Sequence, residues 1–152
     1  MRDAVDNAET YLTEHATKER KVLLIVTDGN DNASLATMDR IEERAEQAGT
    51  VIYAVGLFGT EDPGRVRLGH RELDRLTERT GGLSYYPASF DEISAVVTDI
   101  ARQIRTQYTI AYAPLNQAED GSYRTIRVEA RAPERLVVRT RRGYRAIKKD
   151  GT

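Results

Sequence analysis

Apolar residues follow two different patterns along the chain, and the change between them comes at about residue 107. Before it, continuous runs rich in β-branched residues alternate with segments whose apolar positions recur every three or four residues. The runs at 22–26 and 51–57 show no alternation, which is typical of parallel strands buried on both faces. After residue 107, apolar and polar residues alternate singly, which indicates antiparallel strands with one buried face.

The segments between the runs carry helix signals. Ser89 and Glu92 match a capping box, and Gly49 follows the last periodic residue of a second helix. The stretch 59–70 contains Asp62-Pro63-Gly64 and is predicted to be a loop. Helices are therefore predicted at 2–15, from Thr37 to Gly49, from Leu73 to Gly81 and from Ser89 to Ile104, with a third, shorter strand at 83–86.

The order of these elements predicts an α/β fold. Residues 1–106 are expected to form a three-layer, Rossmann-like unit of parallel strands with flanking helices, joined by right-handed crossovers. Residues 107–146 are expected to form an antiparallel β appendage, with strands near 108–113, 125–130 and 136–138, and residues 147–152 a tail.

The amino-acid composition excludes several kinds of functional site. A chain of 152 residues with 39% apolar residues supports a single core. It contains no cysteine, which excludes a disulfide, a thiolate metal site and a cysteine nucleophile. Its two histidines, His15 and His70, lie in different segments and have no acidic or serine partner at a recognisable spacing. No apolar run is long enough to cross a membrane, and the first residues do not resemble a signal peptide.

Charge is distributed unevenly although the formal net charge is only −1. Residues 1–100 carry 19 acidic and 11 basic side chains, whereas residues 101–152 carry 5 acidic and 12 basic ones. One interpretation is that a basic appendage packs against an acidic α/β unit. The alternative is a patch that binds nucleic acid, made of Arg139, Arg141, Arg142, Arg145, Lys148 and Lys149. Of the two interpretations, a nucleic-acid partner is the less expected.

Asp28 is the residue that points most directly at chemistry. It follows the first strand, and ligands of open α/β sheets bind beyond the carboxyl ends of the strands, where a carboxylate can hold a hard cation. An aspartate at this place can equally begin a turn or cap a helix. An alternative function is a magnesium-dependent phosphoryl hydrolase that uses Asp28 and Asp31, but the chain has no phosphate-binding G-x-x-x-x-G-K-[ST] loop.

Two stretches carry a family resemblance. The run from Lys21 to Asp31, followed by a helix and by Gly49 to Gly56, resembles the C-terminal half of a von Willebrand factor type A domain. The segments 104–114, 123–128 and 138–144 are similar to the tail of the bacterial VWFA-related subgroup. The resemblance covers about residues 2–146 and implies a noncatalytic protein-binding module rather than an enzyme. Extracytoplasmic location is expected from the resemblance alone.

The resemblance also implies a partial metal site. In that family, three loops hold a divalent cation: an Asp-x-Ser-x-Ser loop, a threonine loop and an aspartate, and Asp28 matches the aspartate. Asp-x-Ser-x-Ser is absent from the sequence, and the threonine loop would precede Arg2. Mg²⁺ or Mn²⁺ is therefore expected to bind weakly or not at all, because one carboxylate offers too few protein ligands.

The same comparison predicts an open sheet edge. In the family, the strand matching residues 22–26 pairs with a strand that has no counterpart in this sequence. An unpaired apolar edge favours association, so self-association through residues 22–26 is expected. The chain is further expected to be a piece of a longer protein whose missing part supplies the other metal loops.

Overall fold

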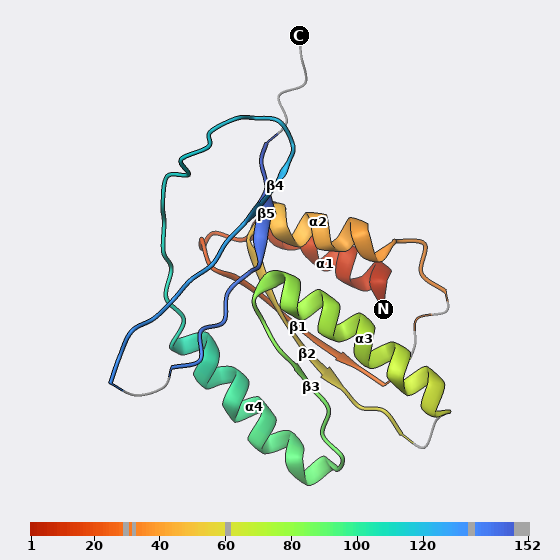
Figure 1. Cartoon of the computed structure of the whole chain (residues 1–152). Coiled ribbons are helices and arrows are strands. Elements are labelled where there is room, and N and C mark those ends of the chain that lie inside the picture. Colours follow the sequence, from red (N-terminus) through yellow and green to blue (C-terminus); the bar gives the residue numbers. More distant parts are fainter. Residues whose placement is uncertain (29–30, 32, 60–61, 134–135, 148–152) are drawn as a thin grey trace.

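The computed structural model describes residues 1–28, 31, 33–59, 62–133 and 136–147 (Figure 1). Helices and strands alternate through the first two thirds of the chain, and two short strands follow. None of the described helices combines the length and the apolar character needed to cross a bilayer. In chain order the elements are α1 (Arg2–His15), β1 (Lys21–Thr27), α2 (Met38–Ala48), β2 (Thr50–Gly56), α3 (Pro63–Thr80), β3 (Ser84–Tyr85), α4 (Phe90–Arg105), β4 (Tyr123–Thr125) and β5 (Gly143–Arg145).

The first three strands form a parallel sheet in the order β1-β2-β3. β1 and β2 are in register over their whole length, from Lys21 opposite Thr50 to Thr27 opposite Gly56. β3 is short and pairs Ser84 with Ala54. The predicted α/β class with parallel strands is therefore confirmed, and β2 is the central strand.

Helices cover both faces of this sheet and form two separate cores. On one face, α1, α2 and α3 pack side by side, and their apolar residues join the inward side chains of β1 and β2 (Figure 1). On the other face, α4 packs through Ile100 against Tyr53 and Val55. The sequence-predicted three layers are therefore present, with three helices on one face and one on the other.

The helix-end signals in the sequence agree with the structure for α2 and differ from it for α3 and α4. Thr37 caps α2 by accepting a hydrogen bond from the Arg40 N–H, and Gly49 ends it with a positive φ of 68°. Ser89 precedes α4, but its side chain makes no capping bond. The stretch 59–70 was wrongly predicted as a loop, because Asp62 is the N-cap and Pro63 the first residue of α3. Both residues suit a helix start as well as a turn.

The C-terminal part is less regular than predicted. β4 and β5 form a two-stranded antiparallel sheet in which Arg124 pairs with Tyr144. The segments 108–113, 125–130 and 136–138 were predicted as strands. This was wrong for 108–113, 127–130 and 136–138, which carry no strand pairing in the structure, whereas Thr125 belongs to β4 and the Ile126 N–H donates a backbone hydrogen bond to the Arg142 carbonyl. Their alternating apolar side chains remain largely exposed. Of the predicted tail, residues 148–152 lie outside the described residues.

Candidate functional site

A groove runs along the outer edge of β1. α1 supplies one wall and β1 the other, and the groove encloses about 370 Å³. Two β1 side chains near it are unusually exposed for a sheet, Leu24 at 44% and Val26 at 61%. The residues that line the groove are Met1, Ala4, Val5, Ala8 and the run from Leu23 to Asp28.

The shape of this groove follows from the packing distances of helices and strands. Packed helices lie about 8–10 Å apart, whereas paired strands lie about 4.8 Å apart. Three helices side by side are therefore wider than the three strands beneath them. α1 is the outermost helix, next to α2, and it reaches the β1 edge, where small side chains, Ala4 and Ala8, leave the groove open.

β1 pairs on one side only. Val22 to Val26 lie opposite residues of β2, and no other strand of the described chain pairs with β1. The strand is apolar throughout its centre, so its edge combines unpaired backbone with apolar side chains. Such an edge is a template for another strand.

Asp28 lies at the carboxyl end of β1, where the sequence placed the candidate cation ligand. It forms the end of the groove beside Thr27. Among the described residues, no group of three or more histidine, cysteine, aspartate or glutamate side chains could hold a metal ion. Asp28 is the one acidic side chain among the described residues that line the groove.

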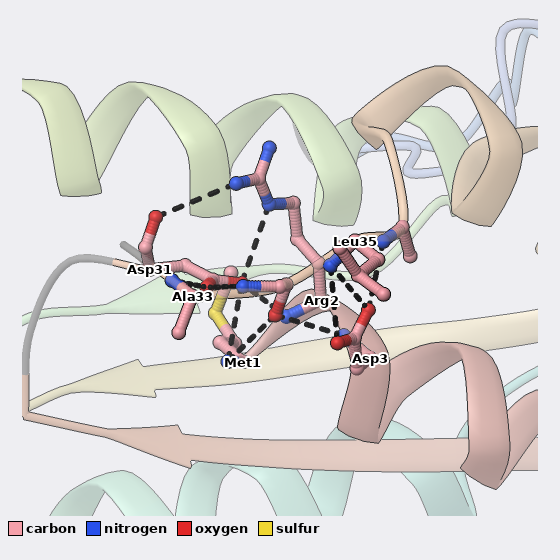
Figure 2. Close-up of polar contacts among 8 residues, drawn as sticks. Met1, Arg2, Asp3, Asp31, Ala33 and Leu35 are labelled. Carbon is pink, nitrogen blue, oxygen red and sulfur yellow. Dashed lines mark hydrogen bonds and ion pairs between the residues drawn. The ribbon is translucent and has the colours of Figure 1, made fainter.

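Asp31, the second residue of the hydrolase alternative, binds groups at the start of α1 (Figure 2). Its Oδ2 accepts a hydrogen bond of 2.5 Å from the Arg2 backbone N–H and lies 3.1 Å from the N-terminal ammonium of Met1. Its Oδ1 accepts a bond of 3.0 Å from the Ser34 N–H. Burial alone raises the pKa of Asp31, but the bonds from Ser34, Arg2 and the ammonium outweigh it and hold the pKa well below its usual range.

Asp3 binds the same loop from the other direction. Its carboxylate accepts hydrogen bonds from the backbone N–H groups of Ala36, at 2.7 Å, and Leu35, at 3.0 Å. These two bonds lower the pKa of Asp3. Asp3 and Asp31 together join the loop after β1 to the first turn of α1, so both carboxylates hold the backbone that closes the end of the groove.

A second hollow of about 330 Å³ lies between α2, α3 and the appendage, and its charges neutralise one another. The Arg75 Nε lies 2.6 Å from Glu42, and the Arg79 Nε lies 2.7 Å from Glu46. Both glutamates are nearly buried. No sequence pattern indicates these pairs, because their members are more than 30 residues apart.

The basic residues of the appendage follow the first of the two interpretations of the charge pattern. Arg142 forms an ion pair of 2.6 Å with Glu78 on α3, and Arg145 lies 3.7 Å from Glu43 on α2. The Arg79 guanidinium also lies 5.0 Å from the centre of the Tyr123 ring. Two arginines of the appendage thus pair with glutamates of α2 and α3, while Lys148 and Lys149 lie outside the described residues.

Both histidines stack on tyrosine rings. His15 is exposed and stacks on Tyr11. His70 is half-buried and stacks on the Tyr86 ring, with 3.7 Å between the ring centres. The Tyr86 hydroxyl donates a hydrogen bond of 2.7 Å to Asp74, so it joins the segment after β3 to α3.

Comparison with known proteins adds no relative: no protein-family model, no curated protein sequence and no solved structure matches this chain. The groove and the residues around it therefore carry the functional argument.

Proposed function

We propose that this chain is a noncatalytic protein-binding module that takes an extended apolar segment of another protein as an added strand along β1. The observation that carries the proposal is the groove between α1 and the open edge of β1. In this mode of recognition, main-chain hydrogen bonds supply affinity and alternate side chains supply specificity.

The residues along the β1 edge indicate which kind of segment would bind there. Its centre, from Val22 to Val26, is apolar, and Leu24 and Val26 gain most from being covered because they are the most exposed side chains of β1. Charges of opposite sign mark the two ends, with Lys21 at the start and Asp28 just past the end. A fitting segment therefore has an apolar centre, an acidic group beside Lys21 and a basic group beside Asp28.

Three further observations support a binding role over the alternatives. Asp31 is occupied by cationic and backbone partners, which weighs against a hydrolase that needs Asp28 and Asp31 together. Arg142 and Arg145 pair with Glu78 and Glu43, which weighs against a nucleic-acid surface. The resemblance to a von Willebrand factor type A domain, a family of binding modules, agrees with the proposal. In this reading Mg²⁺ or Mn²⁺ has no required role.

The test is selection of peptides from a random library of eight-residue segments displayed on phage, with the immobilised chain as bait. We expect enrichment of sequences with alternating apolar residues, and a synthetic peptide of the enriched sequence is then titrated. Ala8→Arg fills the groove, so it should weaken binding at least tenfold. Asn7→Arg is the matched control, because Asn7 is exposed on the same helix and does not line the groove.

Two results would contradict the proposal: no enrichment of strand-like sequences, or equal loss of affinity in Ala8→Arg and Asn7→Arg. Pairing of two copies through the same edge, which the sequence predicts as self-association, is read separately by gel filtration with light scattering.

A further inference from the structure

The geometry points to an internal competitor for this edge: residues 108–113 can dock along β1 of their own chain as a fourth parallel strand and close the groove. This inference rests on the proposed function, because it describes how binding at the β1 edge is regulated. The structure presents the open state, in which this segment, here called the arm, lies away from β1 (Figure 1).

The arm has the residues of a strand but lacks a strand partner. Its large apolar side chains occur at every second position, and they are exposed: Tyr108 at 89%, Ile110 at 71% and Tyr112 at 55%. Exposure of three such side chains in a row costs hydrophobic free energy that burial would recover. The arm therefore has exposed apolar side chains and no strand partner, and the β1 edge has an unpaired backbone beside apolar side chains. Pairing of the two would bury both sets of apolar side chains.

The arm begins beside the start of β1. The Arg20 guanidinium donates a hydrogen bond of 3.4 Å to the carbonyl oxygen of Gln107, immediately before the arm. If parallel pairing starts at this contact, Tyr108 lies beside Lys21 and Ala113 beside Val26. Pro114 then reaches Thr27, the last residue of β1. Proline has no N–H to donate, so it ends an added strand where β1 itself ends.

The topology permits this closure. α2 and α3 connect the strands on one face of the sheet, whereas α4 lies on the opposite face. A chain that leaves β3, crosses that opposite face and returns to the far side of β1 makes a right-handed crossover. The connection from β3 through α4 to the arm is thus of the common hand.

The rest of the appendage can stay in place during closure. Residues 114–122 connect the arm to β4 and can span at most about 30 Å. β1 is about 23 Å long, so this linker can return from its end to the neighbourhood of its start, where β4 lies. Burial and the neighbouring Tyr144 side chain raise the pKa of Tyr112 in the open state, so closure must separate the Tyr112 and Tyr144 side chains.

The first experiment detects the closed state by disulfide trapping in the full chain. The natural sequence has no cysteine, so only an engineered pair can react. Leu24→Cys with Ala111→Cys places the two thiols opposite each other in the inferred register, within reach of a disulfide. Leu24→Cys with Ala118→Cys, out of register, is the control. We expect at least fivefold more intramolecular disulfide in the first pair under the same oxidation.

Equal yields of the two pairs would overturn the inference. Disulfide-linked dimers as the main product would overturn it as well, since they would show that the arm docks on a second copy.

The second experiment measures regulation, with the phage-selected peptide as probe. Ile110→Lys should disfavour the closed state and tighten peptide binding, by about tenfold if the closed state holds nine tenths of the molecules. Tyr144→Phe removes a hydroxyl that lies beside Tyr112 in the open state, so it should favour the closed state and weaken binding. Leu115→Lys is the control for added charge, because Leu115 is exposed and lies beyond the arm.

The outcomes separate the two proposals. Equal affinities of the natural chain, Ile110→Lys and Tyr144→Phe would overturn regulation by the arm and leave strand binding standing. If none of these chains binds any selected peptide, strand binding is overturned, and the disulfide experiment decides whether the arm closes the edge.

Discussion

The Thr50 hydroxyl donates a hydrogen bond of 2.8 Å to Oε2 of Glu9, and both residues are almost completely buried beneath α1. The other oxygen of Glu9, Oε1, has no hydrogen-bond partner among the described residues. Burial raises the pKa of Glu9, although the Thr50 bond and the charges of Lys21 and Arg44 act in the opposite direction. A buried carboxylate therefore lies at the junction of α1 and β2.

The first prediction concerns the cost of this charge. Because the pKa of Glu9 is higher in the folded state than in the unfolded one, its contribution to stability is complete below the unfolded pKa and is lost as the pH rises through the folded pKa. Glu9→Gln keeps an acceptor for Thr50 and removes the ionisation. We expect it to raise the free energy of unfolding at pH 7 by about 1 kcal/mol.

Urea denaturation between pH 5 and pH 8 measures this effect, and Glu14→Gln, an exposed change on the same helix, is the control. The stabilisation should shrink toward pH 5. A loss of stability at pH 7 would show that the Glu9 carboxylate is favourable as it stands.

The second prediction concerns Asp31. Asp31→Asn replaces a carboxylate that five donor groups contact by an amide, and we expect a loss of about 2 kcal/mol in the free energy of unfolding at pH 7. The pKa of Asp31 is depressed in the folded state, so its stabilisation is present above the unfolded pKa and fades as the pH falls below it. Thermal unfolding at pH 7 and pH 3 tests the sign, with the exposed Asp91→Asn for comparison; similar losses in both variants would contradict it.

The third prediction concerns Asp28 and divalent cations. Asp28 is the one acidic residue that lines the groove, and no group of three or more metal-binding side chains lies among the described residues, so Mg²⁺ or Mn²⁺ should bind weakly or not at all. Titration calorimetry on the full chain measures the affinity, and Asp28→Ala identifies the site. A submicromolar dissociation constant that is abolished by Asp28→Ala would contradict the prediction.

The fourth prediction concerns the contact between β2 and the turn after α3. A Cβ atom at Gly82 would lie 1.9 Å from the carbonyl oxygen of Ile52, in the middle of the sheet. Gly82→Ala should therefore lower the free energy of unfolding by about 2–3 kcal/mol. Gly59→Ala is the control, because a Cβ there meets nothing within 4 Å. Equal stability of the two variants would show that the backbone of β2 can shift at no cost.

Much of the α/β unit could be predicted because local signals agree there with tertiary packing. The run from Val22 to Val26 is apolar at every position and forms the predicted parallel strand. Its predicted burial on both faces was wrong, because β1 is an edge strand in which Ile25 is buried while Leu24 and Val26 are exposed. Thr37 and Gly49 mark helix ends by chemistry that acts within a few residues. Pro63 misled the prediction because the same Asp-Pro pair begins turns and helices alike.

The rest depended on contacts between distant residues. Alternation at Tyr108, Ile110 and Tyr112 predicts a strand, but a strand also needs a partner, and the sequence does not say which edge supplies it. The open edge of β1 was expected from the family resemblance. The groove beside it was not, because it depends on how far α1 reaches past β1. The bond from Ser34 to Asp31 is local, but the contact of Asp31 with Arg2 joins residues 29 positions apart and had no sequence signal.

The strand order β1-β2-β3 also has a consequence for synthesis on the ribosome. Each new strand joins the sheet on the side away from β1, so the outer side of β1 is never covered by the strands that follow. About 80 residues separate the end of β1 from the arm, and translation at about 5–20 residues per second takes roughly 4–16 s to make them. A nascent chain therefore presents this apolar edge for several seconds, during which chaperones that bind extended apolar segments compete with the strands of neighbouring nascent chains.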